Sequence, residues 1–506
     1  MSHGETPSGS AALAAILPSN RIALATLRPW AWRRISDGLP AAPRPEPVRT
    51  RSGVASLCVD TAEGSLDLHN RFDPVSEAAA LARHAGANGA RDVVVFGFGA
   101  GYVLEAALAA AAPSARVVCA VIDPGAFVAA LSCRDLSAAL SDPRLLLSVG
   151  DLREIAANLP EAVDELSVIV HAPVLEAAAP ALQPLADMAR ELEAAAISAR
   201  QQRPLVLDNL ARNLPAVLSA PHAGVLRQVC SGRAVLLVAP GPSLEQDLRQ
   251  LARESRPLMV ALDTSLRRLG SAGIRPDLAV TLDPTRGNLG KFTAQDPELP
   301  LVFFASARPE AVAAARHRFF ACEAGGLLDR AHPWFGREGR VSSQGSVLLG
   351  ALDLLLAAGA GPIALVGVDL ALTDRRTHAG SEHQSGDTLR TVAARDGGVV
   401  QTTESLWRHR RRLLRRVAPL PFGQVIDATR HGAELPGLLR QRLETFLEEQ
   451  TRDAASPERQ RERVLQLTEV IDVAARDAAQ AAATRSLLAQ ARDLVEDAEE
   501  TLGASR

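Results

Sequence analysis

One short segment of the chain carries the residue types best suited to bind an anion. Four apolar residues, Val235–Val238, predict a buried strand, and a tight turn with Gly241 and Pro242 follows. Ser243 is a preferred N-cap residue, and Gln246 three positions later completes a capping box, so a helix should begin here. Backbone N–H groups and the positive end of the helix dipole would then point to one place and stabilise a phosphate or carboxylate. A well-capped turn without a ligand has the same pattern.

Three carboxylates stand at the ends of other apolar runs. Each run is bounded by turn signals and is typical of a strand buried on both faces. The runs and their last residues are 259–263 with Asp263, 278–283 with Asp283, and 363–369 with Asp369. Ligands of open parallel sheets bind outside the carboxyl ends of the strands, so we expect these aspartates to lie at one edge with the Ser243 turn. Any one of them can instead cap the next helix.

An earlier group of strands precedes a glycine-rich loop. The run 92–97 leads into Gly97, Gly99 and Gly101, and a helix and a second strand ending at Asp123 follow. Nucleotide-binding and methyltransferase sheets use this order, with the acid on a ribose. Glycines also serve any tight turn, and the Pro-Gly after Asp123 is a plain turn signal. We therefore expect this loop to be structural.

These patterns predict an α/β protein with two Rossmann-like, mostly parallel sheets followed by a C-terminal helical region. A chain of 506 residues is too long for one core. The predicted parts are a loosely ordered N-terminal arm (1–52), an N-terminal Rossmann-like domain (53–200) that opens with a hairpin at 53–70, a catalytic domain (201–436), and a helical region (437–506).

Composition excludes several classes of protein. The net charge of −3 gives no polybasic signal for nucleic acid or anionic membranes. The five cysteines are scattered without a CxxC pair, which favours small buried side chains in a reducing compartment over disulfides or zinc. No apolar run reaches transmembrane length, and the N-terminus lacks a signal-peptide pattern, so we expect a cytoplasmic protein.

An ordered set of motifs resembles the motility-associated factor family, the flagellin glycosyltransferases of flagellated bacteria. The matching segments are LHNRFDPVSEA (68–78), FGFGAGYVLE (96–105), GPSL (241–244), IRPDLAVTLDP (274–284) and GVDLALTDRRTHAG (367–380). The resemblance extends in pieces from about residue 66 to 435. It implies transfer of a sugar to flagellin, in support of flagellum assembly and motility.

The region from Ser342 to Ser346, the next helix, and residues 363–370 resemble bacterial sialyltransferases. That resemblance implies a CMP-activated nonulosonic acid, a sialic-acid-like sugar such as pseudaminic or legionaminic acid, as the donor. The acceptor would be a Ser or Thr hydroxyl of flagellin. No cofactor is expected beyond this nucleotide sugar, and no set of side chains has metal-ligand spacing, which favours a metal-independent transfer.

The expected roles follow from these resemblances and from position. The general base is His378, with His383 in reserve and Asp369 beside it. Contacts to the donor and its nucleotide are expected from Gly241, Pro242, Ser243, Asp263, Asp283, Ser343, Gly345 and Ser346. Structural alternatives remain: Ser346 can be a helix cap, the aspartates can hold loops rigid, and a loop histidine is often only solvated.

Two features depart from a simple match. The family often has Gln where this chain has Val368, and its late motif Asn-Ala-Thr-Glu-Gly-Gly-Ala reads Asp-Ala-Thr-Arg-His-Gly-Ala at 427–433, with Arg430 and His431.

After Thr403, a helix with six arginines at 408–416 is predicted. Its arginines can pair with an acidic sugar or a surface partner, but a solvated face is the interpretation we favour.

Two other functions compete with glycosyl transfer. The central motifs also resemble 6-hydroxymethylpterin diphosphokinase of the archaeal type, which would need ATP and magnesium. The altered motif at 427–433 is also compatible with a non-catalytic, flagellin-binding assembly factor. A comparison of sugar transfer by the chain with intact and with substituted His378 separates the assembly factor from the glycosyltransferase.

Overall fold

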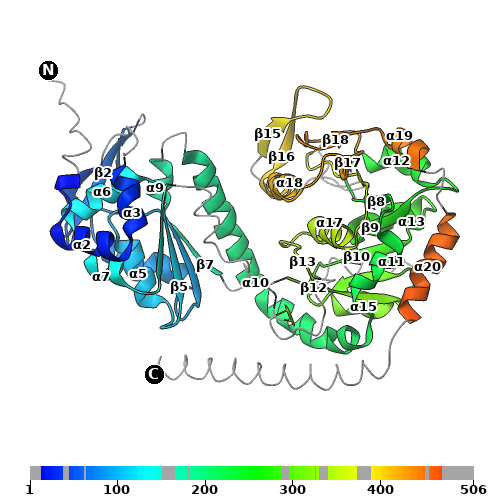
Figure 1. Ribbon diagram of the computed structural model, residues 1–506, viewed down its shortest axis with the longest axis horizontal. Coiled ribbons are helices and arrows are strands. Elements are labelled where there is room, and N and C mark those ends of the chain that lie inside the picture. Colours follow the sequence, from blue (N-terminus) through cyan, green and yellow to red (C-terminus); the bar gives the residue numbers. More distant parts are fainter. Residues whose placement is uncertain are drawn as a thin grey trace. The chain divides into compact units, whose positions relative to one another are not determined.

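The computed structural model describes residues 13–37, 45–61, 64–150, 166–178, 182–285, 296–324, 326, 328–329, 340–372, 389–450 and 455–469. The chain divides into two compact units, residues 1–203 and 204–506 (Figure 1). Each contains a parallel sheet with helices, so the predicted α/β class with two Rossmann-like sheets is confirmed. Among the described residues, no helix is both long enough and apolar enough to cross a bilayer.

The first unit is built on a four-stranded parallel sheet in the order β6-β5-β4-β7, as counted over the described residues. Its strands are β4 (Asp92–Phe96), β5 (Arg116–Val121), β6 (Leu145–Val149) and β7 (Leu166–Val170). The helices of this unit are α4 (Pro74–His84), α5 (Tyr102–Ala110), α6 (Pro124–Cys133), α7 (Ser137–Ser141) and α9 (Ala172–Glu176). The strands β4 and β5 lie where the apolar runs predict them, because both faces of the sheet are covered.

The N-terminal segment is more ordered than the predicted loose arm. It forms α2 (Pro18–Leu27) and α3 (Pro29–Ser36), and the buried Asn20 side chain donates to the carbonyls of Leu131 (2.8 Å) and Arg134 (2.6 Å). Our prediction underrated this segment because its anchor is a long-range polar contact. The expected hairpin is confirmed within a small antiparallel sheet of β1 (Glu46–Arg49), β2 (Ala55–Thr61) and β3 (Gly64–Asp67).

The glycine-rich loop after β4 packs against two histidines. Gly99 has φ +52°, and a Cβ there would overlap the rings of His69 and His171. Asp123 caps α6, since its Oδ1 accepts from the N–H groups of Gly125 (2.7 Å) and Ala126 (3.2 Å). The protein's own packing thus accounts for this glycine and this acid.

His171 is buried without a hydrogen-bonding partner for either ring nitrogen in the described part of the chain. Its ring lies 4.3 Å from that of His69, centroid to centroid, while His69 accepts from the N–H of Ala100 and pairs with Glu77. Burial, reinforced by the nearby His69 and opposed by Glu77, lowers the pKa of His171 from 6.5 to about 3.

This lowered pKa predicts an acid-sensitive first unit. Between pH 6.5 and 3, His171 binds a proton in the unfolded chain but not in the folded chain. Its contribution to the free energy of unfolding is therefore fully present above pH 6.5 and is lost progressively below that pH. Lowering the pH from 8 to 5 should remove about 2 kcal/mol of unfolding free energy through this residue. Urea denaturation of the wild type and of His171→Leu at both pH values measures it. An equally steep loss in His171→Leu would contradict the assignment.

The second unit contains a nine-stranded parallel sheet, counted over the described residues. Its strands are β8 (Val235–Val238), β9 (Leu258–Leu262), β10 (Leu278–Thr281), β11 (Leu301–Phe304), β12 (Arg318–Glu323), β13 (Arg340–Val341), β14 (Ile363–Val366), β17 (Val425–Asp427) and β18 (Leu439–Arg440). They lie in the order β13-β12-β11-β10-β9-β8-β14-β17-β18. The chain builds outward from β8 in one direction and from β14 in the other, so the strand order reverses between these two neighbours.

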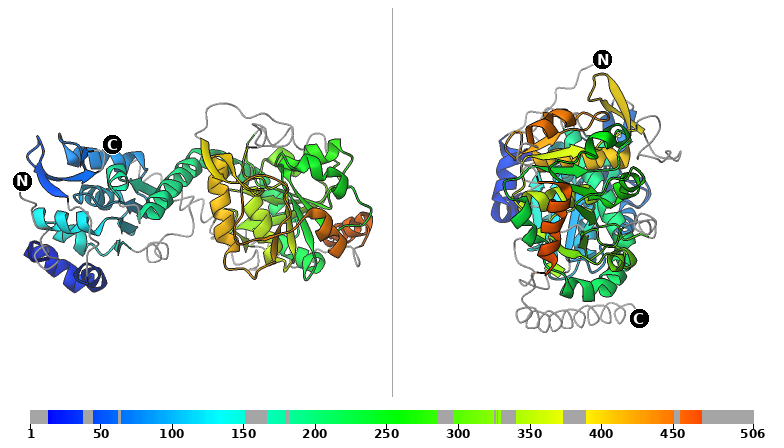
Figure 2. Two further views of the ribbon diagram at one scale, coloured as in Figure 1. Left: turned by 90° about the horizontal axis from the view of Figure 1, so that it is seen from above. Right: turned by 90° about the vertical axis from the view of Figure 1, so that its right-hand side faces the viewer.

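Helices cover both faces of this sheet (Figures 1 and 2). One face packs against η2 (Ala223–Leu226), α11 (Arg227–Cys230), α17 (Val347–Ala357), α18 (Glu404–Val417) and α20 (Pro457–Glu469). The other packs against α12 (Leu244–Leu251), α13 (Asp263–Ser271), α15 (Pro309–Ala314), α19 (Leu443–Gln450) and the end of α10 (Gln183–Ser219). A two-stranded hairpin, β15 (Leu389–Ala393) and β16 (Val399–Thr403), leads into α18.

Candidate functional site

The predicted residues gather at the carboxyl edge of the second sheet. The turn with Gly241 and Ser243 follows β8, and Asp369 follows β14, the strand beside it. Asp263 and Asp283 follow β9 and β10, the next two strands along the sheet. The expected convergence on one edge is therefore confirmed, and it lies at the switch point, where open α/β sheets bind their ligands.

A buried pair of hydrogen bonds joins the two central motifs. The backbone N–H of Ser243 donates to Oδ2 of Asp369 (2.8 Å), and the Ser243 hydroxyl donates to Oδ1 (2.5 Å). Each residue is only 1% exposed. Burial raises the pKa of the Asp369 carboxyl, although the two hydrogen bonds from Ser243 oppose the shift. The turn after β8 and the segment after β14 thus act as one structural unit.

The predicted capping box is wrong. Ser243 has helical backbone angles, and its side chain makes no capping bond to α12, which begins at Leu244. The hydroxyl is committed to Asp369 instead, and the Gln246 side chain faces the ring of His431 (3.2 Å). In a capping box the Ser243 hydroxyl would accept from the N–H of Gln246, but that N–H donates to the Ser243 carbonyl instead (3.1 Å).

The turn after β8 also uses its N–H groups within the protein. Gly241 donates to the carbonyl of Gly367 (2.7 Å), and Leu244 donates to that of Gly241 (3.0 Å). A Cβ at Gly241 would overlap both Asp369 and the Gly367 carbonyl. Close backbone approach therefore explains the glycine, and binding of a donor phosphate by Gly241, Pro242 and Ser243 stays a prediction.

Ser243→Ala should destabilise the second unit. The change leaves the buried Asp369 carboxylate with one hydrogen bond fewer, which costs about 1–3 kcal/mol. Urea denaturation followed by circular dichroism measures the loss, and Ser405→Ala, at an exposed position of α18, is the matched control. If both variants unfold at the wild-type midpoint, the Ser243 hydroxyl has no such role.

Asp263 and Asp283 make hydrogen bonds within the protein at the points where their strands end. Asp263 is buried, and its two oxygens accept from the N–H of Thr264 (2.6 Å) and the hydroxyl of Thr281 (2.9 Å) at the end of β10. Asp283 accepts from the N–H (2.9 Å) and hydroxyl (2.7 Å) of Thr285. These contacts give both aspartates a structural role, and a contact with the nucleotide remains a prediction for each.

The turn before α17 has a strained, specific geometry. Gln344 and Gly345 both have positive φ, of 48° and 73°. The N–H of Ser343 donates to Glu323 (2.9 Å), and the Ser343 hydroxyl accepts from the N–H of Gly345 (3.1 Å). Ser346 stands at the N-cap position without a side-chain capping bond, so the helix-cap alternative does not account for its hydroxyl.

Sequence reasoning missed Arg395, which lies in the turn between β15 and β16. Its guanidinium is buried and donates to Asp427 (2.6 Å), to the carbonyl of Val368 (2.9 Å) and to the carbonyl of His431 (2.6 Å). It thus ties the hairpin to the segments after β14 and β17. A single arginine in a turn carries no sequence signal, whereas Asp427, a fourth strand-end aspartate, fits the pattern already used.

The two residues that depart from the family motif form ion pairs at this edge. Arg430 pairs with Asp247 (2.5 Å) and with Glu444, and His431 pairs with Asp396 (2.7 Å). Burial raises the pKa of Asp247 to about 6, although Arg430 opposes the shift. The positive charge that replaces an acid in the motif is therefore compensated by two carboxylates.

The predicted base and its reserve, His378 and His383, lie outside the described residues. The arginines of α18 are less solvated than predicted, because five of the six are partly buried. Thr403 caps the helix as expected, but of the six arginines at 408–416 only Arg415 is exposed. Arg416 pairs with Asp353 (2.5 Å), and Arg412 donates to the carbonyl of Gln344 (2.6 Å) in the turn before α17.

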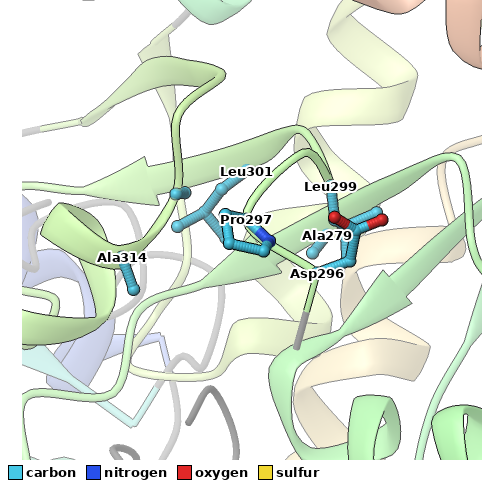
Figure 3. A pocket seen from close by; sticks show the side chains of 7 residues that line it. Ala279, Asp296, Pro297, Leu299, Leu301 and Ala314 are labelled. Atoms are coloured by element: carbon cyan, nitrogen blue, oxygen red, sulfur yellow. The ribbon is translucent and has the colours of Figure 1, made fainter. Parts of the chain in front are cut away.

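A small cavity lies elsewhere in the second unit (Figure 3). It is lined by Ala279, Asp296, Pro297, Leu299, Leu301, Ala314 and Ala315. Its room for the centre of a water molecule is about 20 Å³, enough for roughly one water. It is too small for a nucleotide.

In the described part of the chain, no group of three or more His, Cys, Asp or Glu side chains is placed to hold a metal.

Comparison with known proteins returns a family profile and several solved structures. The profile of the family described as 6-hydroxymethylpterin diphosphokinase MptE-like matches residues 208–375. The solved structure of a MAF glycosyltransferase from Magnetospirillum magneticum AMB-1 aligns over 91% of this chain and 78% of that chain, with 16% identity and a TM-score of 0.49. No curated protein sequence matches. The profile confirms the predicted resemblance of the central domain to the MptE-like family.

Proposed function

We propose that this chain is a glycosyltransferase that moves a nonulosonic sugar from a CMP-activated donor to a Ser or Thr hydroxyl of flagellin. The observation that carries the proposal is the buried pair of Ser243 and Asp369 at the switch point of the second sheet. It joins two motifs that resemble the flagellin glycosyltransferases, and the edge that it forms is where a nucleotide sugar would lie.

In this reaction the bond between the sugar and the CMP phosphate breaks as the acceptor oxygen bonds to the sugar. Negative charge grows on the departing phosphate and needs N–H or cationic partners. The turn from Ser343 to Ser346, at the start of α17, is proposed to supply some of them. The acceptor proton passes to His378, in the segment that follows Asp369. Asp369 itself, being buried and hydrogen-bonded to Ser243, would hold the turn after β8 in place.

Mass spectrometry tests the function directly. Flagellin incubated with the purified chain and a CMP-nonulosonic acid should gain the mass of the sugar on Ser or Thr. Flagellin from cells with and without the chain should differ in the same way. Flagellin that binds the chain but gains no mass, with every nonulosonate donor tried, would favour the non-catalytic assembly factor instead.

A diphosphokinase activity is the second candidate, because the MptE-like profile matches residues 208–375, which include the strands of the second sheet from β8 to β14. The chain would then transfer a diphosphate from ATP to the hydroxymethyl group of a pterin and release AMP, with magnesium on the ATP. Release of AMP that depends on both pterin and magnesium would establish it. Mass gain on flagellin without ATP would exclude it as the source of the transfer.

A further inference from the structure

Arg410, on α18, has no carboxylate partner within the described part of the chain. Its Nε donates to the backbone carbonyl of Glu434 (2.7 Å), and the side chain is partly buried. Two other arginines of the helix reach different places, since Arg416 pairs with Asp353 and Arg412 faces the turn at Gln344.

The head group of Arg410 lies beside the candidate site. Glu434 follows Ala433, whose N–H donates to the carbonyl of Asp369 (2.8 Å). The start of α18 is fixed to the same segment, because the hydroxyl of Thr402 donates to the carbonyl of Leu370 (2.9 Å). Arg410 therefore extends from α18 toward the strand ends that carry the central motifs.

The charges around Arg410 are mixed. Burial lowers its pKa, Glu434 opposes the shift, and the nearby Arg395 adds to it. One position earlier, burial together with Arg412 and Arg408 lowers the pKa of His409 to about 4. Arginine stays protonated even so. Within the described part of the chain only the Nε of Arg410 is engaged, so its other N–H groups can donate to an oxyanion that reaches the partly desolvated guanidinium.

We propose that Arg410 binds an oxyanion of the substrate at the carboxyl edge of the second sheet. The inference rests on the proposed function, whose donor carries two such groups, the sugar carboxylate and the nucleotide phosphate. Either group presents two oxygens, and the planar guanidinium of arginine binds such a pair in a bidentate manner.

Calorimetric titration of the full chain with CMP-N-acetylneuraminic acid and with CMP tests the proposal. Arg410→Gln should bind the CMP-sugar about 10- to 100-fold more weakly than the wild type, the expected effect of losing a hydrogen bond between charged groups. If Arg410 holds the carboxylate, the affinity for CMP should not change. If it holds the phosphate, both affinities should fall together.

Two variants serve as controls. Arg415→Gln makes the same charge change at the exposed position of the same helix and should alter neither affinity more than twofold. Arg410→Lys keeps the charge and should recover part of the loss. Wild-type affinity for both ligands in folded Arg410→Gln would overturn this inference alone. A wild-type chain that binds neither cytidine ligand would overturn the proposed function, and the Arg410 inference with it.

Discussion

Replacing Arg395 with methionine should destabilise the second unit by about 3–5 kcal/mol, the usual consequence of removing one partner of a buried ion pair. The carboxylate of Asp427, 3% exposed, would remain without its cation. The carbonyls of Val368 and His431 would also lose their donor. Methionine fills a similar volume, so the loss would come from charge and hydrogen bonding more than from a cavity.

Hydrogen exchange of the β14 amides, together with urea denaturation, measures this change locally and globally. Arg415→Met makes the same substitution at an exposed position and should leave the midpoint unchanged. In the double variant Arg395→Met with Asp427→Leu, the unpaired carboxylate is gone, so part of the lost stability should return. Equal stability of Arg395→Met and the wild type would show that the hairpin does not depend on this ion pair.

The strands and their common edge could be predicted because the information is local. A parallel strand buried on both faces reads as an unbroken apolar run, as 235–238 and 363–366 do. The side chain after such a run must lie at the carboxyl edge, so the placement of Asp263, Asp283 and Asp369 follows without knowledge of any contact.

The contacts at that edge could not be predicted, because they join distant parts of the chain. Ser243 and Asp369 are separated by 126 positions, and the local sequence around Ser243 describes a capping box equally well. The serine hydroxyl donates its single proton to the buried carboxylate, and the Gln246 N–H that a capping box would bind donates to the Ser243 carbonyl instead (3.1 Å). Only the strand order, with β14 beside β8, brings that carboxylate to the turn.

The arginines show the same limit. Six arginines in one helix resemble a solvated face, since charge runs usually are one, yet the neighbours of α18 bury or pair most of them. Which arginine keeps an unpaired charge depends on where each side chain ends. Arg410 and Arg412 are two residues apart, and one reaches the loop after β17 while the other reaches the turn before α17.

His378→Ala should lower transfer to flagellin by about 10²–10⁴-fold, the usual contribution of a general base. A neutral imidazole near pH 7 accepts the acceptor's hydroxyl proton as the glycosidic bond forms, and alanine cannot. Because the base acts on the acceptor, the affinity for CMP-N-acetylneuraminic acid should stay at the wild-type value. The pH dependence of turnover, centred near the ordinary histidine pKa of about 6.5, should disappear with the imidazole.

His383→Ala is the matched control, since it removes the other histidine of the same segment. Full transfer by His378→Ala combined with loss in His383→Ala would move the role to His383.

If both variants keep transfer, the acceptor loses its proton to another group. The next residues to test are then those that form ion pairs at the carboxyl edge. His431 is held by Asp396 at 2.7 Å, the arrangement in which a carboxylate orients a histidine. His431→Ala, with the same two measurements of transfer and donor affinity, would then decide whether that imidazole takes the proton.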